Sequence, residues 1–303
     1  MVDEIIKKFS KKTESKFFIN YNLRKLNWFN IGGKAKFFFK PDNLNELVSF
    51  LKEFGKKIDI FILGAGSNIL LNDRLYEGVV IKLGKNFSNI TLMPNDVIVA
   101  GAAASDKKLS DFALNNSISG FEFLSCIPGT IGGGLKINSG CYGKEFKDIL
   151  LSVQVIEKNT GFIKTIQSSD INFEYRNSDL DDNYIFLSAS FKGVKKEKSF
   201  IEKEIKILKS KKNFTQPSKI KTGGSTFKNP VDQTTEKVWK LIKRSVPLNT
   251  SFGQAAISEK HCNFLINRGN ATFEDMLKLI QFIKKEVRLK TGITIETEIQ
   301  IIE

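Results

Sequence analysis

The chain has 303 residues, 41% of them apolar, and a formal net charge of +14 at pH 7. This length exceeds what one small core needs and predicts two or three packed units that can enclose a cofactor. No apolar run reaches the roughly eighteen residues that a membrane span requires, and Asp3 and Glu4 stand where a signal peptide would be basic. We therefore expect a cytoplasmic protein with no membrane partner.

The cysteines and the net charge limit the classes of function that we expect. The three cysteines are far apart and form no CxxC pair, which is typical of free thiols in a reducing compartment, and we expect no metal site. The positive charge would attract polyanions, either nucleic acids or phosphorylated metabolites. The densest lysine cluster, residues 195–212, contains glutamates and apolar residues at helical spacing, which predicts an amphipathic helix with a solvated face.

The first predicted unit is a strand–helix–strand segment between Lys36 and Leu71. An apolar strand leads into Pro41-Asp42-Asn43, which is typical of a helix start, and a second strand covers residues 58–63. That strand ends in Gly64-Ala65-Gly66-Ser67-Asn68. A Rossmann fingerprint would open a helix here and would need a third glycine, where the chain has Ile69, so we do not predict an NAD-type fold.

A second α+β unit is predicted between residues 96 and 191, because alternating segments at 97–100, 151–156 and 185–191 flank a helical stretch and a glycine-rich region. From about Phe200 the chain is predicted to be helical, with a short helix around Trp239. A longer helix over 273–289 begins with a capping box, and the last segment, 293–301, alternates strictly like a strand. The fold class is α+β, with boundaries at 1–85, 86–200 and 201–303.

The strongest local motif is the glycine-rich stretch Ile127-Pro128-Gly129-Thr130-Ile131-Gly132-Gly133-Gly134. Glycines lack a Cβ atom, so successive backbone N–H groups can converge on an anion such as a pyrophosphate. Isolated glycines more often form tight turns. The number of glycines here and the second loop at residues 64–68 favour a phosphate-binding cradle.

Taken in order, these motifs resemble the enolpyruvoylglucosamine reductases over nearly the whole chain. The resemblance begins with Asn27 to Gly33 and continues through both glycine-rich loops. The remaining motifs are Tyr175-Arg176-Asn177-Ser178, Gly224 to Pro230, Ser258-Glu259-Lys260-His261, and Ile295-Glu296-Thr297-Glu298-Ile299. The family implies two N-terminal subdomains that bind FAD as in vanillyl-alcohol oxidase, and a C-terminal α+β substrate domain.

The resemblance implies that NADPH, acting through FAD, reduces the enolpyruvyl ether of UDP-N-acetylglucosamine to UDP-N-acetylmuramate in peptidoglycan precursor synthesis. It assigns a stabilising role to Arg176, proton donation to Ser225 and a catalytic role to Glu298. Tyr175 and Lys228 would contact the substrate. The implied FAD-binding residues are Gly64, Ala65, Gly66, Ser67, Asn68, Pro128, Gly129, Thr130, Gly132 and Gly133.

Each assignment has a plainer alternative. Arg176 could form a surface ion pair, Ser225 could cap a turn, and Glu298 shares its predicted strand face with Glu296. Lys228 could be solvated.

Two other functions remain open. The basic charge alone would suit a nucleic-acid-binding protein. Ser225, the single histidine His261 and an aspartate could form a hydrolase triad, although Phe227 stands where a nucleophile elbow needs glycine.

The chain departs from the family pattern at Cys126 and Lys136, where we expect a small and an apolar residue. It has no long insertion after Tyr184, which resembles the shorter form of the family, so we assign no lid residue. The oligomeric state is not predicted.

Overall fold

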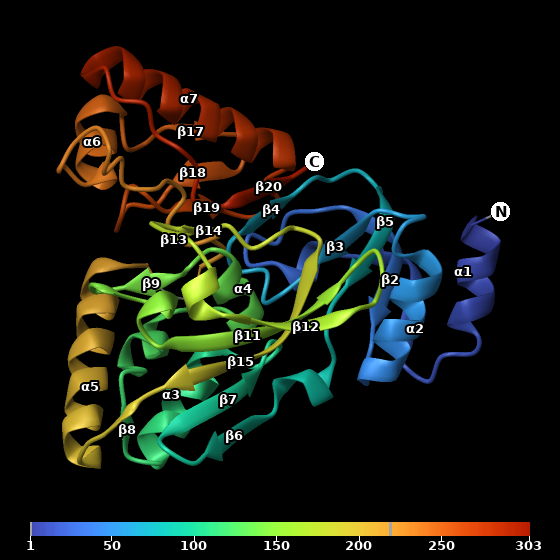
Figure 1. Ribbon diagram of the computed structural model, residues 1–303. Helices are drawn as coiled ribbons and strands as arrows, with labels where there is room; N and C mark the ends of the chain where they lie inside the picture. The colour runs from blue at the N-terminus through green and yellow to red at the C-terminus, as the bar shows by residue number, and fades with distance from the viewer. Residues whose placement is uncertain (1, 218–219) are drawn as a thin grey trace. The chain divides into compact units, whose positions relative to one another are not determined.

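The structure is a computed structural model that describes residues 2–217 and 220–303. The chain divides into two compact units, each drawn from segments that are far apart in the sequence. Unit 1 comprises Met1–Tyr21, Ala35–Ala65 and Glu77–Lys211, and unit 2 comprises Asn22–Lys34, Gly66–Tyr76 and Lys212–Glu303. Both units contain helices and strands (Figure 1), which confirms the predicted α+β class. No helix in the described part of the chain combines the length and apolarity needed to cross a membrane.

The first sheet of unit 1 includes the predicted strand–helix–strand segment. The side chain of Asn43 caps the helix α2 (Leu44–Phe54) by accepting the N–H of Glu46. The helix and the sheet bury a cluster of phenylalanines that includes Phe37, Phe39 and Phe50. In sheet order the strands are β1 (Lys16–Asn22), β2 (Lys34–Lys40), β5 (Tyr76–Ile81) and β3 (Ile60–Ile62), with helices α1 (Val2–Ser10) and α2 (Leu44–Phe54).

The second sheet of unit 1 has five antiparallel strands, three of which are the predicted segments at 97–100, 151–156 and 185–191. Its strands in order are β12 (Ile163–Gln167), β11 (Leu150–Glu157), β15 (Tyr184–Lys192), β7 (Val97–Gly101) and β6 (Ile90–Met93). The helices are α3 (Asp106–Asn115), α4 (Ile131–Lys136) and α5 (Lys198–Thr215), of which residues 212–215 belong to unit 2. Short strand pairs are β8 (Ile118–Ser119) with β16 (Val194–Lys195), β9 (Gly140–Cys141) with β10 (Lys144–Glu145), and β13 (Phe173–Glu174) with β14 (Asn177–Ser178).

Unit 2 is organised around its longest helix, α7 (Phe273–Thr291). The predicted capping box is present, because Thr272 and Asp275 each accept the other's backbone N–H. The helix ends at Gly292, whose φ of 73° is the left-handed conformation that glycine adopts readily. The other elements are β4 (Ile69–Leu71), α6 (Val238–Ser245), β17 (Ser251–Phe252), β18 (Ala255–Ile257), β19 (Leu265–Asn267) and β20 (Gln300–Ile302).

The C-terminal strand is shorter than predicted. Only Gln300–Ile302 form β20, which pairs in parallel with β4, whereas the sequence predicts a strand over 293–301. The preceding residues pair with a different segment, through the bridge between Phe227 and Thr297. The backbone bends between these two partners, which interrupts the strand, although Ile295 and Ile299 are both buried as the alternation predicts.

Candidate active site

Two of the predicted cofactor loops approach each other within unit 1. A Cβ atom added to Gly64 would lie 2.8 Å from Oγ1 of Thr130, which is closer than real Cβ atoms come to a neighbour. A Cβ atom added to Gly132 would lie 3.2 Å from the Cβ of Ala102, which is also tighter than an ordinary contact. The absence of a side chain at Gly64 therefore allows the first loop to lie against Thr130 of the second loop, and two glycine-rich loops held together in this way suit the binding of a pyrophosphate.

Lys82 is a residue that the sequence reasoning missed. It directly follows strand β5, and its Nζ donates a hydrogen bond to the carbonyl of Gly64. Burial lowers the pKa of Lys82, and the nearby charge of Lys40 adds to the effect. A half-buried cation beside a glycine loop suits a phosphate group. The available signal was a lysine placed immediately after the apolar run Val79–Ile81.

Asp106 is the second missed residue. It is fully buried at the start of α3, and neither carboxyl oxygen has a hydrogen-bond partner among the described residues. A Cβ on Gly129 would overlap its Oδ2, so the carboxyl group packs directly against the second glycine loop. Burial raises the pKa of Asp106 well above its usual range. Burial thus favours the uncharged form of this carboxyl group beside the second glycine loop.

These features fit an FAD molecule. The glycine loops leave no room for a Cβ at Gly64, Lys82 supplies positive charge, and burial disfavours the charged form of Asp106. The first loop continues into unit 2, where Gly66 has a φ of 69° and its carbonyl accepts the N–H of Trp28. Ala65 belongs to unit 1, Ser67 and Asn68 to unit 2, and Pro128, Thr130 and Gly133 to unit 1.

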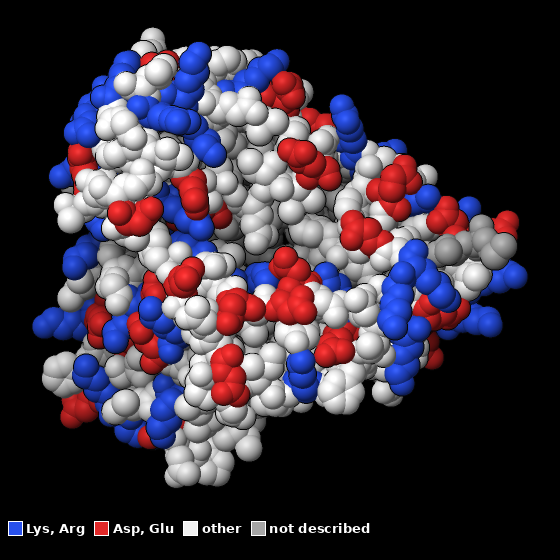
Figure 2. Space-filling model, turned by 45° about the horizontal axis from the view of Figure 1, so that its top comes forward, with Lys and Arg blue, Asp and Glu red and all other residues white. Residues whose placement is uncertain are grey.

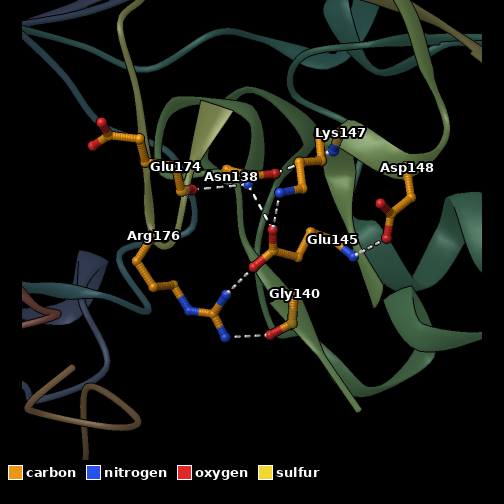
Figure 3. Close-up of polar contacts among 7 residues, drawn as sticks. All are labelled: Asn138, Gly140, Glu145, Lys147, Asp148, Glu174 and Arg176. Atoms are coloured by element: carbon orange, nitrogen blue, oxygen red, sulfur yellow. Dashed lines mark hydrogen bonds and ion pairs between the residues drawn. The ribbon is translucent and has the colours of Figure 1, made fainter. Parts of the chain in front are cut away.

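Arg176 is held in a polar network in unit 1 (Figure 3). Its guanidinium donates to the carbonyl of Gly140 at 2.6 Å and lies 3.4 Å from Oε1 of Glu145. The other carboxyl oxygen of Glu145 accepts from the buried Asn138 and is paired with Lys147. Only 14% of the Arg176 side chain is exposed, so a solvated surface ion pair does not describe this residue.

The backbone of Arg176 is also unusual. Its φ of 56° lies in the left-handed region, which non-glycine residues seldom adopt, in the turn between β13 and β14. The ring of the preceding Tyr175 lies 5.0 Å from the guanidinium carbon, within cation–π range. The turn therefore holds the side chains of Tyr175 and Arg176 against each other.

Ser225 and Glu298 lie on neighbouring backbone segments of unit 2. The N–H of Glu298 donates to the carbonyl of Thr226 at 2.8 Å, and its own carbonyl accepts from the side chain of Asn68 at 3.0 Å. Ser225 pairs on its other side with Phe264. The structure therefore brings two of the three predicted catalytic residues together with the last residue of the first glycine loop.

The alternation in the sequence places Glu296 and Glu298 on the same predicted strand face, whereas in the structure the two residues differ in exposure. The Glu296 side chain is 74% exposed, and its Oε2 lies 3.6 Å from Nζ of Lys228. Glu298 is only partly exposed, and its backbone is held by hydrogen bonds on both sides. Lys228 is itself 28% exposed and stands on the same strand-like segment as Ser225, so it is not a freely solvated lysine.

The hydrolase triad is not supported by the geometry of His261. Its Nδ1 accepts the backbone N–H of Asn263 at 3.2 Å, whereas a triad histidine must donate from Nδ1 to an aspartate. Burial also lowers the pKa of His261, and its ring packs against Phe264 and Trp239. These contacts indicate a structural histidine.

The two departures from the family pattern are accommodated in unit 1. Lys136 ends α4 with an ion pair to Asp182 at 2.7 Å, and Cys126 is buried at the end of a short 3₁₀ segment.

Two protein families match parts of the chain. The FAD binding domain family matches residues 35–167, and the C-terminal domain family of UDP-N-acetylenolpyruvoylglucosamine reductase matches residues 216–302. These matches confirm the predicted order of an FAD-binding fold followed by a distinct C-terminal domain. FAD is thus the cofactor of the N-terminal part.

Individual relatives extend the likeness to the whole chain. The UDP-N-acetylenolpyruvoylglucosamine reductase of Pelagibacter ubique strain HTCC1062 is 63% identical over 99% of both chains. That of Rickettsia conorii is 44% identical over 93% of this chain and 94% of its own. The crystal structure of the enzyme from Thermus caldophilus superposes with a TM-score of 0.81 at 26% identity, covering 96% of this chain and 99% of that one. The chain belongs to the UDP-N-acetylenolpyruvoylglucosamine reductase family of FAD-containing oxidoreductases.

Proposed function

We propose that this protein reduces UDP-N-acetylglucosamine enolpyruvate to UDP-N-acetylmuramate, with NADPH as the reductant and FAD as the bound cofactor. The observation that carries the proposal is the likeness to a reductase of that name over 99% of both chains. The geometry agrees with the proposal, because hydrogen bonds hold Arg176 in unit 1 and the backbone of Glu298 in unit 2. The product would enter peptidoglycan precursor synthesis in the cytoplasm, where NADPH is available.

The FAD would be held by the two glycine loops, with Gly64 and Thr130 facing each other and Lys82 beside them. When bound, FAD supplies hydride transfer from NADPH to the β carbon of the alkene. Asp106, whose charged form is disfavoured by burial, packs against Gly129 of the second loop. Residues 1–85 and 86–200 would be the two FAD-binding subdomains, and 201–303 the substrate domain.

Arg176 would stabilise the negative charge that builds up on the substrate carboxylate. A guanidinium is always charged at neutral pH, and its planar fork matches a carboxylate. In the structure, Glu145 and Gly140 hold the guanidinium in place, so that little reorganisation is needed when charge develops. Tyr175, stacked on the same guanidinium, would contact the substrate next to it.

Ser225 would deliver the proton that the α carbon needs after the β carbon has received hydride. A serine hydroxyl is a weak acid, so a neighbouring group must lower the cost of its transient deprotonation. Glu298 and Lys228 are the charged residues on the adjoining backbone segments. Glu298 would act in this proton-transfer step, as the family resemblance implies, and Lys228 would contact a substrate phosphate or carboxylate.

The basic charge does not favour a nucleic-acid partner. On the face that Figure 2 draws, Lys and Arg gather at the upper left and are mixed with Asp and Glu elsewhere, so the charge alone gives no reason to prefer a nucleic acid to a phosphorylated metabolite.

The experiment is an NADPH oxidation assay with the enolpyruvyl substrate, followed by mass spectrometry of the product. The product should carry two more hydrogen atoms than the substrate, one from hydride and one from a proton. NADPH oxidation that does not require the UDP-sugar, or a product of unchanged mass, would contradict the proposal.

A further inference from the structure

Asn138 is fully buried in unit 1 and has a left-handed backbone, with a φ of 42°. It closely follows helix α4, and its backbone N–H donates to the carbonyl of Leu135 at 3.2 Å, which ties it to the last turn of that helix. Asparagine adopts this conformation more readily than most non-glycine residues. Glycine would also fit this backbone, but it would lack the amide group.

The amide group of Asn138 forms hydrogen bonds through both of its ends (Figure 3). Its Nδ2 donates to Oε2 of Glu145 at 2.9 Å and to the carbonyl of Glu174 at 3.0 Å, and its Oδ1 accepts the backbone N–H of Lys147 at 3.1 Å. The two amide hydrogens therefore have two separate acceptors. An ionised aspartate of the same size would have no hydrogen to donate and would repel the carboxylate of Glu145.

Two contacts of the Arg176 side chain depend on the segment that Asn138 begins. One carboxyl oxygen of Glu145 accepts from Asn138, and the other lies 3.4 Å from Nη1 of Arg176. The carbonyl of Gly140, two residues beyond Asn138, accepts from Nη2 of Arg176 at 2.6 Å. Asn138 therefore orients the carboxylate that faces one nitrogen of the guanidinium, and its backbone leads into the carbonyl that holds another (Figure 3).

The same amide holds the backbone of Arg176. Strands β13 and β14 pair Glu174 with Asn177, which leaves Tyr175-Arg176 as a two-residue turn. Asn138 donates to the carbonyl of Glu174, directly before that turn. Because Arg176 is itself left-handed, with a φ of 56°, the surrounding contacts must maintain the conformation of the turn. One buried side chain thus supports both the backbone and the guanidinium of Arg176.

We propose that Asn138 is a positioning residue for the reaction, which fixes the Arg176 guanidinium relative to the second glycine loop. That loop runs into α4, and α4 ends two residues before Asn138, so a short path within unit 1 joins the loop to the guanidinium. A guanidinium that is fixed before the substrate binds needs little reorganisation when negative charge develops. The inference rests on the proposed function, because it uses the task assigned there to Arg176.

The test compares the two half-reactions of FAD-loaded Asn138→Gly, which keeps the left-handed backbone and removes the amide. Flavin reduction by NADPH should proceed near the unmutated rate, whereas reoxidation by UDP-N-acetylglucosamine enolpyruvate should slow roughly tenfold to a hundredfold. Asn95→Gly is the matched control, because Asn95 is also left-handed and lies in unit 1 but is exposed, and its reoxidation rate should be unchanged. An unchanged reoxidation rate in Asn138→Gly, or equal slowing of both half-reactions, would overturn the proposal.

A double-mutant cycle tests whether Asn138 acts through Arg176. In the Arg176→Ala background, Asn138→Gly should slow reoxidation little further, and a full additional loss would contradict the positioning role. If Asn138→Gly takes up no flavin, Asn138→Asp, which keeps the size of the side chain, serves for the same comparison.

Failure of the proposed function gives a different result. In that case the substrate does not reoxidise the flavin of the unmutated protein, and a crystal structure of Asn138→Gly tests the placement of Arg176 by itself. A guanidinium displaced from Gly140 and Glu145 would support the role of Asn138, and an unmoved one would overturn it.

Discussion

The contact between the two glycine loops predicts the effect of Gly64→Ala on FAD binding. The added Cβ would lie 2.8 Å from Oγ1 of Thr130, and ordinary contacts begin at 3.4 Å, so the Thr130 side chain or one of the loops must move by about 0.6 Å. Overpacking of this kind costs about 1–3 kcal/mol. The loops can separate without FAD but must converge to bind it, so the affinity should fall roughly tenfold to a hundredfold. Titration of apoprotein with FAD, followed by flavin fluorescence, measures this change.

A double-mutant cycle isolates the contact. Thr130→Ala removes the hydroxyl and should partly restore affinity in the Gly64→Ala background, whereas Thr130→Val keeps a heavy atom in its place and should not. Gly269→Ala is the control, because its Cβ would meet only the side chain of Gln254 at 3.6 Å. Unchanged FAD affinity in Gly64→Ala, or an equal loss with and without Thr130, would refute the reasoning.

Three further predictions concern single residues. In Ser225→Ala, stopped-flow absorbance should show flavin reduction by NADPH near the unmutated rate but reoxidation by substrate slowed roughly 10²–10⁴-fold, and an unchanged reoxidation rate would refute proton donation. Arg176→Ala should slow the same reoxidation step, while Glu145→Gln, which keeps Arg176 charged but loosens its anchor, should slow it less. Asp106 holds its proton in the folded state above the usual value of 3.8, so stability should fall as pH rises from about 4 towards its raised pKa. Urea unfolding of Asp106→Asn at fixed FAD should show a shallower fall over this range, and parallel pH profiles would contradict the assignment.

The elements that could be predicted from sequence have their determinants close together in the chain. The cap of α2 lies within Asn43 to Glu46, and the start of α7 depends on Thr272 and Asp275. The length of the C-terminal strand could not be predicted, because it depends on where the backbone leaves residues 226–228 and joins β4. Neither partner is near it in the sequence.

The candidate site also combines features with local determinants and features that depend on distant segments. The glycine loops were recognisable because glycine has a local conformational meaning. Lys82 and Asp106 were missed because burial by distant segments is what distinguishes them from ordinary charged residues. The position of Arg176 likewise depends on Gly140 and Glu145, more than thirty residues away. The sequence therefore indicates which residues carry the chemistry, whereas the structure indicates what holds them.

The most direct test of the proposed function is an anaerobic titration of the purified protein followed by its visible spectrum. The protein should carry an oxidised flavin spectrum that NADPH bleaches and that UDP-N-acetylglucosamine enolpyruvate then restores, with UDP-N-acetylglucosamine itself having no effect. A protein that takes up no flavin, or a bleached flavin that the enolpyruvyl substrate fails to reoxidise, would contradict the proposal that this chain is an FAD-dependent reductase of that substrate.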